Sequence, residues 1–332
     1  MKELQAILRH LTAPGTNAGV LATLVTVEGS SYRRPGARLL VTAQGERLGS
    51  ISGGCLEEDV LARARSVAAS GRAELVVYDT SSENDLVWGV GLGCHGVVQV
   101  LLEKLSPQPA WVASLAANLE SRRPTGLAVV WRAGTPGLLG TRLAGEIPVL
   151  PADTGIFRQT VEPPVSLVIF GAGDDAQPLA GFARQLGWHV TVADPRPAFA
   201  TAARFPEADA LVIGPAAELV DRIAPGPEAL AVVMTHHYVH DVPLLRALLS
   251  RPLAYLGLLG PKKRAEKITA DLAGSGFAVT PGMRARLHAP VGLDLGAETA
   301  GEVALAIMAE MQAALGQRDA RPLRERQQPI HD

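Results

Sequence analysis

The sequence predicts an α/β protein with two domains, a mixed α+β domain followed by a doubly wound parallel sheet. Its 332 residues exceed the usual size of a single domain. Pro163 and Pro164 disfavour both helix and central strand, which indicates a boundary. Beyond it, short apolar segments alternate with helical patterns, whereas the preceding part shows no such regularity. We therefore expect domains at 1–162 and 163–320 and a flexible tail at 321–332.

The first domain is expected to open with a helix over its first 11 residues, because Leu4, Ile7, Leu8 and Leu11 recur at helical spacing. An apolar run at 18–27 predicts a buried strand. Further along the expected elements are a hairpin of strands at 36–42 and 46–51, a helix at 56–69, strands at 74–78 and 97–102, a helix at 111–119 and a strand at 127–131.

The second domain is expected to alternate strands with helices. The predicted strands are at 165–170, 190–193, 211–213, 230–234 and 254–256, and helical stretches separate them, the first at 175–186. Such an order requires right-handed crossovers, and these cover both faces of a parallel sheet.

Composition excludes several classes of protein. Hydrophobic residues make up 47% and charged residues 19%, which is enough apolar material for two buried cores. The net charge of −2 provides no field for nucleic acid or an anionic membrane. No apolar run approaches the roughly 18 residues that a membrane span needs. Residues 1–4 do not resemble the start of a signal peptide. Two cysteines are too few for a disulfide framework. We expect a cytoplasmic protein without nucleic-acid or membrane partners.

A glycine turn follows the first strand of the second domain. Residues 171–176 read Gly-Ala-Gly-Asp-Asp-Ala and open a helix, which is the dinucleotide-binding pattern of a Rossmann-like domain. Gly171 would allow the tight turn, and Gly173 would let a pyrophosphate approach the backbone. Asp194 ends the next strand, where an acid would bind a ribose hydroxyl.

The ligand of this turn stays open. Asp174 and Asp175 suit the start of a helix but repel an anionic ligand. The turn could bind NAD, could hold a pterin-linked phosphate, or could serve packing alone.

Both cysteines lie in glycine-rich segments. Cys55 follows Gly53 and Gly54 at the start of a predicted helix, a position that favours the reactive thiolate form, although the adjacent Glu57 and Glu58 oppose it. The alternative is a small buried apolar residue.

Cys94 follows Gly93 and precedes His95, which could be a base, a donor or a ligand. Because 39 positions separate the cysteines and no Cys-x-x-Cys occurs, a zinc site is poorly supported. Thiolates would suit a soft or sulfur-ligated metal.

Two further segments carry candidate polar groups. Ser30, Ser31, Arg33 and Arg34 follow the first strand and could bind an oxyanion, or could form a solvated turn. The segment 235–241 holds three histidines and an aspartate after a core strand, where ligands bind in open α/β sheets.

Together these motifs resemble the XdhC/CoxI family, the xanthine dehydrogenase accessory factors. The resemblance covers most of the chain, in order, and is weakest at about 106–164. It rests on SSYRRPGA at 30–37, SGGCLE at 52–57, FGAGDDA at 170–176, DPR at 194–196, YLGLLG at 255–260, KKR at 262–264 and PVGLDLGAET at 290–299. The chain departs from the family pattern at His237, where an aspartate is usual, and at His95, where a glycine is usual.

The resemblance implies a protein that binds molybdenum cofactor (molybdopterin), protects it during sulfuration and delivers it to the apo-enzyme of a molybdenum hydroxylase such as xanthine dehydrogenase. It also implies a homodimer and a partner sulfurase of the cysteine-desulfurase type. Cys55 and Cys94 would contact molybdenum, while Arg33, Arg34 and the glycine turn would hold the pterin phosphate. The residues expected at the cofactor are Ser30, Ser31, Arg33, Arg34, Gly53, Gly54, Cys55, Gly93, Cys94, His95, Gly171, Gly173, Asp194, Arg196, His236 and Gly257.

Two other functions stay open. An NAD-dependent oxidoreductase would use Asp194 and the glycine turn for the cofactor and His236 for acid–base chemistry. A dimeric adaptor would recruit a sulfurase and carry no ligand.

Overall fold

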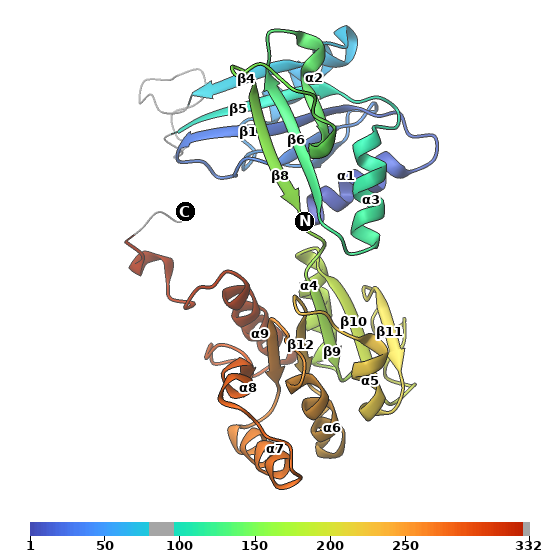
Figure 1. Cartoon of the computed structure of the whole chain (residues 1–332), viewed down its shortest axis with the longest axis vertical. Coiled ribbons are helices and arrows are strands. Elements are labelled where there is room, and N and C mark those ends of the chain that lie inside the picture. Colours follow the sequence, from blue (N-terminus) through green and yellow to red (C-terminus); the bar gives the residue numbers. More distant parts are fainter. Residues whose placement is uncertain (80–95, 328–332) are drawn as a thin grey trace. The chain divides into compact units, whose positions relative to one another are not determined.

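The computed structural model of the chain describes residues 1–79 and 96–327. It divides into two compact units, Met1–Pro164 and Val165–Asp332 (Figure 1). Antiparallel sheets with helices form the first unit and a parallel sheet with helices forms the second, so the predicted α/β class is confirmed. No helix within the described ranges is long and apolar enough to cross a membrane.

The first unit is built on a five-stranded antiparallel sheet with the order β3-β2-β1-β5-β4. Its strands are β1 (Val20–Gly29), β2 (Arg38–Val41), β3 (Arg47–Gly49), β4 (Glu74–Asp79) and β5 (Gly96–Lys104). Helix α2 (Glu57–Ser70) covers one face through the apolar stripe Leu56, Val60, Ala64 and Val67. The helix ends at Gly71, which adopts the left-handed φ of +69° common after a helix.

The opposite face of this sheet packs against helices and a second, three-stranded sheet with the order β7-β6-β8. The elements on this side are α1 (Lys2–Thr12), α3 (Ala110–Glu120), β6 (Thr125–Arg132), β7 (Gly140–Leu143), β8 (Gly155–Val161) and the short helices η1 (Pro136–Leu138) and η2 (Ala144–Glu146). Because both faces are covered, the central strand β1 is buried over its first half, as its unbroken apolar run predicts.

Strands β7 and β8 were absent from the sequence prediction. The four residues of β7 are too few to show alternation, and in β8 the consecutive polar residues Arg158, Gln159 and Thr160 break it. Both strands are stabilised by pairing with β6 instead.

The second unit has a six-stranded parallel sheet with the order β11-β10-β9-β12-β13-β14. Its strands are β9 (Ser166–Phe170), β10 (His189–Asp194), β11 (Ala210–Ile213), β12 (Leu230–Val233), β13 (Tyr255–Leu258) and β14 (Leu287–His288). This is the Rossmann order, in which the chain starts at the centre, proceeds to one edge and returns to build the other half. The two halves meet between β9 and β12, which pair from Leu167↔Leu230 to Phe170↔Val233. The two-residue strand β14 was not predicted.

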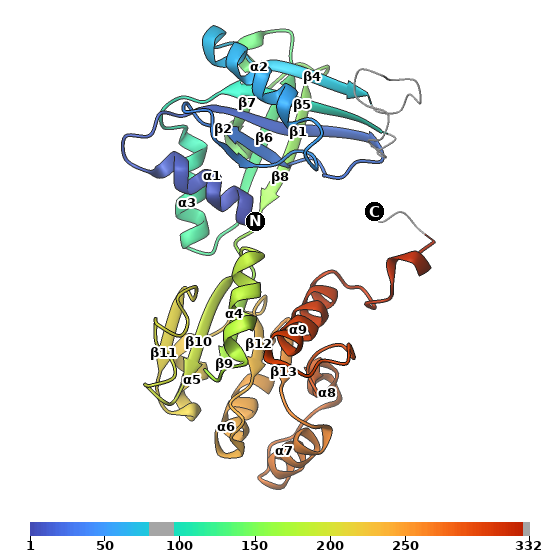
Figure 2. The same cartoon turned by 180° about the vertical axis from the view of Figure 1, so that it is seen from behind.

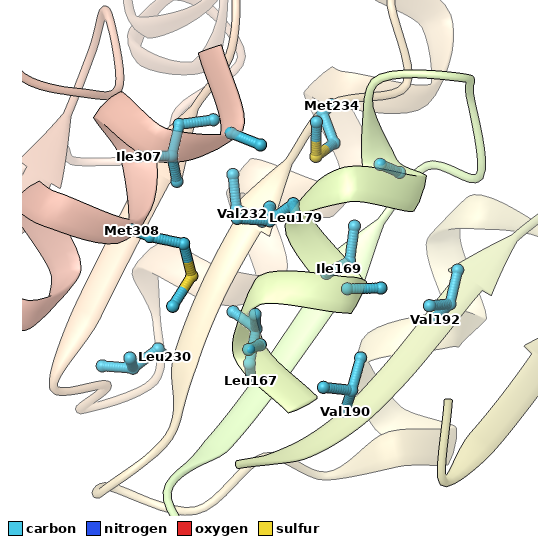
Figure 3. Packing of buried hydrophobic residues seen from close by; sticks show 14 of the residues in the cluster. Leu167, Ile169, Leu179, Val190, Val192, Leu230, Val232, Met234, Ile307 and Met308 are labelled. Atoms are coloured by element: carbon cyan, nitrogen blue, oxygen red, sulfur yellow. The ribbon is translucent and has the colours of Figure 1, made fainter. Parts of the chain in front are cut away.

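Helices cover both faces of the parallel sheet. On one face α4 (Ala176–Gln185) and α9 (Ala300–Leu315) pack together (Figure 2). On the other lie α5 (Ala216–Ile223), α6 (Tyr238–Leu249) and α7 (Lys262–Gly274). The remaining helices are α8 (Pro281–Arg286) and η3 (Leu323–Glu325). Successive strand residues point to opposite faces, so Leu167 and Ile169 of β9 meet Leu179 of α4 on the first face (Figure 3).

Candidate functional site

The loop that carries Cys55 lies between β3 and α2. Gly53, Gly54 and Cys55 are exposed, whereas Ser52 on one side and Leu56 on the other are buried. Gly54 has a φ of +115° and open space where a side chain would stand. The thiol is therefore presented to solvent at an open glycine turn, and the alternative of a buried packing cysteine does not apply to Cys55.

Glu57 anchors this loop from beneath. Glu57 as a whole is 4% exposed. Oε1 accepts hydrogen bonds from Ser50 Oγ (2.8 Å), Ser52 N (2.9 Å) and Ile51 N (3.3 Å). Oε2 accepts from the Ser52 hydroxyl and from Leu56 N (3.3 Å). The first residue of α2 thus ties together both ends of the glycine turn.

Burial would raise the pKa of Glu57, but the hydrogen bonds from Ser52 and Ser50 outweigh it and lower the pKa to about 2. The carboxylate is therefore ionised at neutral pH. Its charge is directed at the backbone of its own loop, while Glu58 is exposed.

The segment after β1 lies against the Cys55 loop. A side chain at Gly53 would begin 3.7 Å from the ring of Tyr32, which is itself 66% exposed. Gly96, the first residue of β5, pairs with Gly29, and a side chain there would come within 2.3 Å of the Ser30 carbonyl oxygen. Segments 30–32 and 52–55 therefore lie together at one end of the strands of the five-stranded sheet. Gly93, Cys94 and His95 lie outside the described residues.

The two neighbouring arginines have different surroundings. Arg33 forms a two-point ion pair with Glu3 of α1, with Nη1 2.9 Å from Oε1 and Nη2 bonded to Oε2. The hydrogen bond that Arg33 donates to Glu3 raises the pKa of Arg33. Arg34 is exposed, and its guanidinium has no hydrogen bond or ion pair with any residue among 1–79 and 96–327.

In the second unit the glycine turn lies where the two halves of the sheet meet. Gly171 has a φ of +120°, and a side chain there would lie 2.5 Å from the carbonyl carbon of Met234. Glycine is required at this position by both conformation and space. The carboxyl ends of β9 and β12 thus approach each other closely, which is the place where open α/β sheets bind ligands.

Asp194, which the sequence suggests as a ribose ligand, is fully buried. Oδ1 accepts from Arg196 N (2.8 Å) and Nε (2.9 Å), and Oδ2 accepts from Arg196 Nη2 (2.8 Å) and Ala172 N (2.7 Å). Burial opposes the charge, but the hydrogen bonds from Arg196 and Ala172 lower the pKa below its ordinary value. Because all acceptor positions of the carboxylate are used, a ribose hydroxyl would have to displace Arg196.

His236 links the two loops at this junction. Its Nε2 lies 2.7 Å from Oδ2 of Asp175, the residue that precedes α4. Oδ1 of Asp175 is buried without a partner among the residues described. His236 itself has a φ of +60°, a strained conformation for a residue with a side chain, and such strain is concentrated at functional sites.

Thr235 and Asp241 are the buried polar residues of segment 235–241, whereas His237 is exposed. Asp241 is 1% exposed, and its carboxylate accepts from Thr235 Oγ1 (2.5 Å) and Arg264 Nε (2.9 Å). Within the described parts of the chain no group of three His, Cys, Asp or Glu side chains could hold a metal ion. Gly257 serves packing in this unit, since a side chain there would lie 2.5 Å from Val291 Cγ2.

Comparison with known proteins identifies the family. The model of the XdhC and CoxI family matches residues 15–79, and that of the XdhC Rossmann domain matches residues 167–311. A Bacillus subtilis protein described as a probable subunit of xanthine dehydrogenase is 34% identical over 88% of this chain and 92% of its own length. The chain belongs to the XdhC and CoxI family. The resemblance inferred from its motifs is confirmed.

Two further relatives add detail. The molybdenum cofactor insertion chaperone PaoD of Escherichia coli is 29% identical over 88% of this chain and 82% of its own length. A crystal structure described as a xanthine dehydrogenase from Bacillus halodurans superimposes with a TM-score of 0.81 at 29% identity, covering 97% of this chain and 99% of that one. The XdhC and CoxI match contains the Cys55 loop, and the XdhC Rossmann match contains the junction of β9 and β12.

Sequence reasoning missed three features of the site. It assigned Glu57 to the helix start without its hydrogen bonds, although a buried acid facing Ser50 and Ser52 across a glycine turn is a recurrent loop anchor. It gave no partner to Asp175, which meets His236 61 positions away. It gave no role to Arg38, which lies inside the strand predicted at 36–42 and is only 4% exposed.

Proposed function

We propose that this chain is an accessory protein that binds molybdenum cofactor and delivers it to a molybdenum hydroxylase. The observation that carries the proposal is the exposed thiol of Cys55 on a glycine turn held rigidly by Glu57. The relationship to PaoD supports the cargo, because that protein is named as a molybdenum cofactor insertion chaperone. The relationship to proteins named xanthine dehydrogenase supports a hydroxylase as the recipient.

The groups around Cys55 suit this cargo. A thiol is a soft ligand, which fits a metal bound by sulfur. The open space at Gly54 leaves room beside it, and the exposed ring of Tyr32 offers an apolar face. Handover requires a site that a second protein can reach, and an exposed loop meets that requirement where a buried pocket would not.

The oxidoreductase alternative is less well supported. In dinucleotide-binding domains the acid after the second strand binds a ribose, but Asp194 is fully engaged by Arg196 and Ala172. The pyrophosphate would sit at the start of α4, where the carboxylate of Asp175 already stands. We therefore do not assign an NAD site to this junction.

The test is anaerobic purification of the chain from a host that synthesises molybdenum cofactor, followed by assays for molybdenum and for the fluorescent oxidised pterin. We expect about one pterin per chain, and Cys55→Ala lowers it severalfold. Because Cys55 is exposed, this variant keeps its stability. The matched control is Ser70→Ala, which alters an exposed residue at the far end of α2.

Two results would contradict the proposal: the absence of pterin from the wild-type chain, or equal pterin in Cys55→Ala and wild type. NAD added to the same preparation tests the alternative, which requires saturable binding. A homodimer, a sulfurase partner and a cytoplasmic location stay predictions, and the native mass of the same preparation tests the first of them.

A further inference from the structure

A cleft in the first unit is lined by three arginines. It lies beside the start of α1, the turn that follows Tyr32 and the end of β8, and its volume is about 380 Å³. The charged and amide side chains that line it are those of Glu3, Arg33, Arg34, Arg38, Gln159 and Glu162. We call it the arginine cleft.

Arg38 is the unusual member of the arginine cleft. It is 4% exposed, and only Nη1 is satisfied, by Gly36 O (3.0 Å) and Gln159 Oε1 (2.9 Å). Nε and Nη2 are buried and have no partner in the part of the chain that the structure describes. Burial lowers the pKa of Arg38 to about 10, an effect that the charge of Glu103 partly offsets.

A buried guanidinium with two unsatisfied donors is costly, because the charge has left water without gaining an ion pair. Glu103 does not provide one, since its carboxylate accepts from Thr141 N (2.9 Å) and the Thr141 hydroxyl (2.5 Å). A water molecule could fill a hydrogen-bond position but could not neutralise the charge. An oxyanion would do both, and a charge-assisted hydrogen bond is about twice as strong as a neutral one.

The rest of the arginine cleft fits an oxyanion. Arg34 adds a guanidinium without a partner among the described residues. Arg33 already binds the carboxylate of Glu3 through two nitrogens. An external anion would have to compete with Glu3 for Arg33. Glu162 is exposed at the rim and its negative charge opposes an anion. With Arg33 and Glu3 paired, the remaining charged side chains that line the cleft are two arginines, Arg34 and Arg38, and one carboxylate, Glu162.

We propose that the arginine cleft binds a phosphate group, with Arg34 and Arg38 supplying the positive charge. The identity of the ligand as a phosphorylated pterin rests on the proposed function, but the existence of the phosphate site does not. Arg38 thus takes the role that the sequence suggests for Arg33, whose guanidinium is paired with Glu3.

The experiment measures binding of inorganic phosphate and of phenyl phosphate to the full chain, without cofactor, by calorimetry at low ionic strength. Arg34→Gln is expected to weaken both about fivefold or more, since one charge-assisted contact is lost. Glu3→Gln is expected to tighten binding severalfold because it releases Arg33. The matched control is Arg47→Gln, an exposed arginine of β3 outside the cleft, which should leave both affinities unchanged.

Arg38→Lys tests the buried position. It keeps a cation but lacks the planar fork of donors, so phosphate affinity should fall while the circular dichroism spectrum stays that of wild type. If Arg38→Lys does not fold, the comparison of Arg34→Gln and Glu3→Gln with Arg47→Gln still decides. Equal affinities in these three variants would overturn the phosphate site.

Pterin retention in the same variants separates the two proposals. Loss of both phosphate affinity and pterin in Arg34→Gln assigns the arginine cleft to the pterin phosphate. Phosphate binding that depends on Arg34 in a chain that never retains pterin would refute the proposed function and leave the phosphate site standing. A phosphate affinity that Arg34→Gln does not change would refute the site, whatever the pterin assay shows.

Discussion

Glu57 offers the sharpest test of how the Cys55 loop is held. In Glu57→Gln the buried group loses its charge. Its amide nitrogen then faces groups that donate hydrogen bonds to the carboxylate in wild type, which are the hydroxyl of Ser52 or the N–H groups of Ser52 and Leu56. Glu58→Gln is the matched control, because it removes the same charge from the same first turn of α2 at an exposed position.

The magnitude follows from the pKa of Glu57. The difference between its ordinary value of 4.5 and about 2 in the folded chain corresponds to about 3 kcal/mol at 1.36 kcal/mol per pH unit. Because the folded pKa is lowered, this stability is fully present above pH 4.5 and is lost as the pH falls towards 2. Glu57→Gln should remove the part of the stability that depends on ionisation of Glu57. It should therefore lower the free energy of loop opening by a similar amount.

Amide hydrogen exchange is the suitable assay, since it reports on the loop and not on the whole two-unit chain. A loss of about 3 kcal/mol accelerates exchange about 100-fold for the N–H groups of Ile51, Ser52 and Leu56 that donate to Glu57. Glu58→Gln should leave these rates close to wild type. If the two variants exchange within about threefold of each other, Glu57 does not anchor the loop.

Three further predictions concern the second unit. Gly171→Ala should lower the free energy of unfolding by at least about 3 kcal/mol, as measured by thermal denaturation. Gly276→Ala should lower it by about 1 kcal/mol, because Gly276 also has a positive φ but has open space around it. Asp194→Asn should lower the free energy of unfolding in urea by about 2 kcal/mol at pH 7. This difference from wild type should narrow as the pH falls from the ordinary pKa of 3.8 towards the lowered pKa of the folded chain, because the carboxylate of the unfolded wild-type chain is protonated first; a difference that is constant with pH would contradict the role of the charge. Arg264→Ala should cost about 3 kcal/mol because it leaves Asp241 buried and unpaired, and Arg264→Lys should recover part of that loss; equal stability of the two would show that the ion pair is unimportant.

Local sequence patterns predicted most of the fold. Apolar spacing at Leu4, Ile7, Leu8 and Leu11 located α1, and the alternation of strands and helices beyond Pro164 indicated the parallel sheet. The patterns failed at β7, β8 and β14, whose short or polar strands are stabilised by neighbouring strands and not by their own sequence.

The candidate site was less predictable than the fold. The glycine motifs predicted which loops carry the candidate site, and Gly171 has the positive φ that its turn requires. The orientation of the charged groups beside those loops did not follow from the motifs. Asp194 and Arg33 form hydrogen bonds within the chain, whereas the sequence suggested that they face a ligand. Glu57 likewise binds its own loop, where the sequence suggested only a charge beside the thiol.

By itself the sequence determined the class of fold and the positions of the glycine turns, because backbone propensity and apolar periodicity act over a few neighbouring residues, and its motifs determined the family. Only the tertiary structure decided which charges are available to a ligand. Arg33 is paired with Glu3, 30 positions away. Arg38 is buried beside Gln159, 121 positions away, and its Nε and Nη2 have no partner among residues 1–79 and 96–327. Such pairings depend on how strands and helices pack. On an isolated segment water solvates each charge, and burial removes that water, so that the charge must find a partner in the fold.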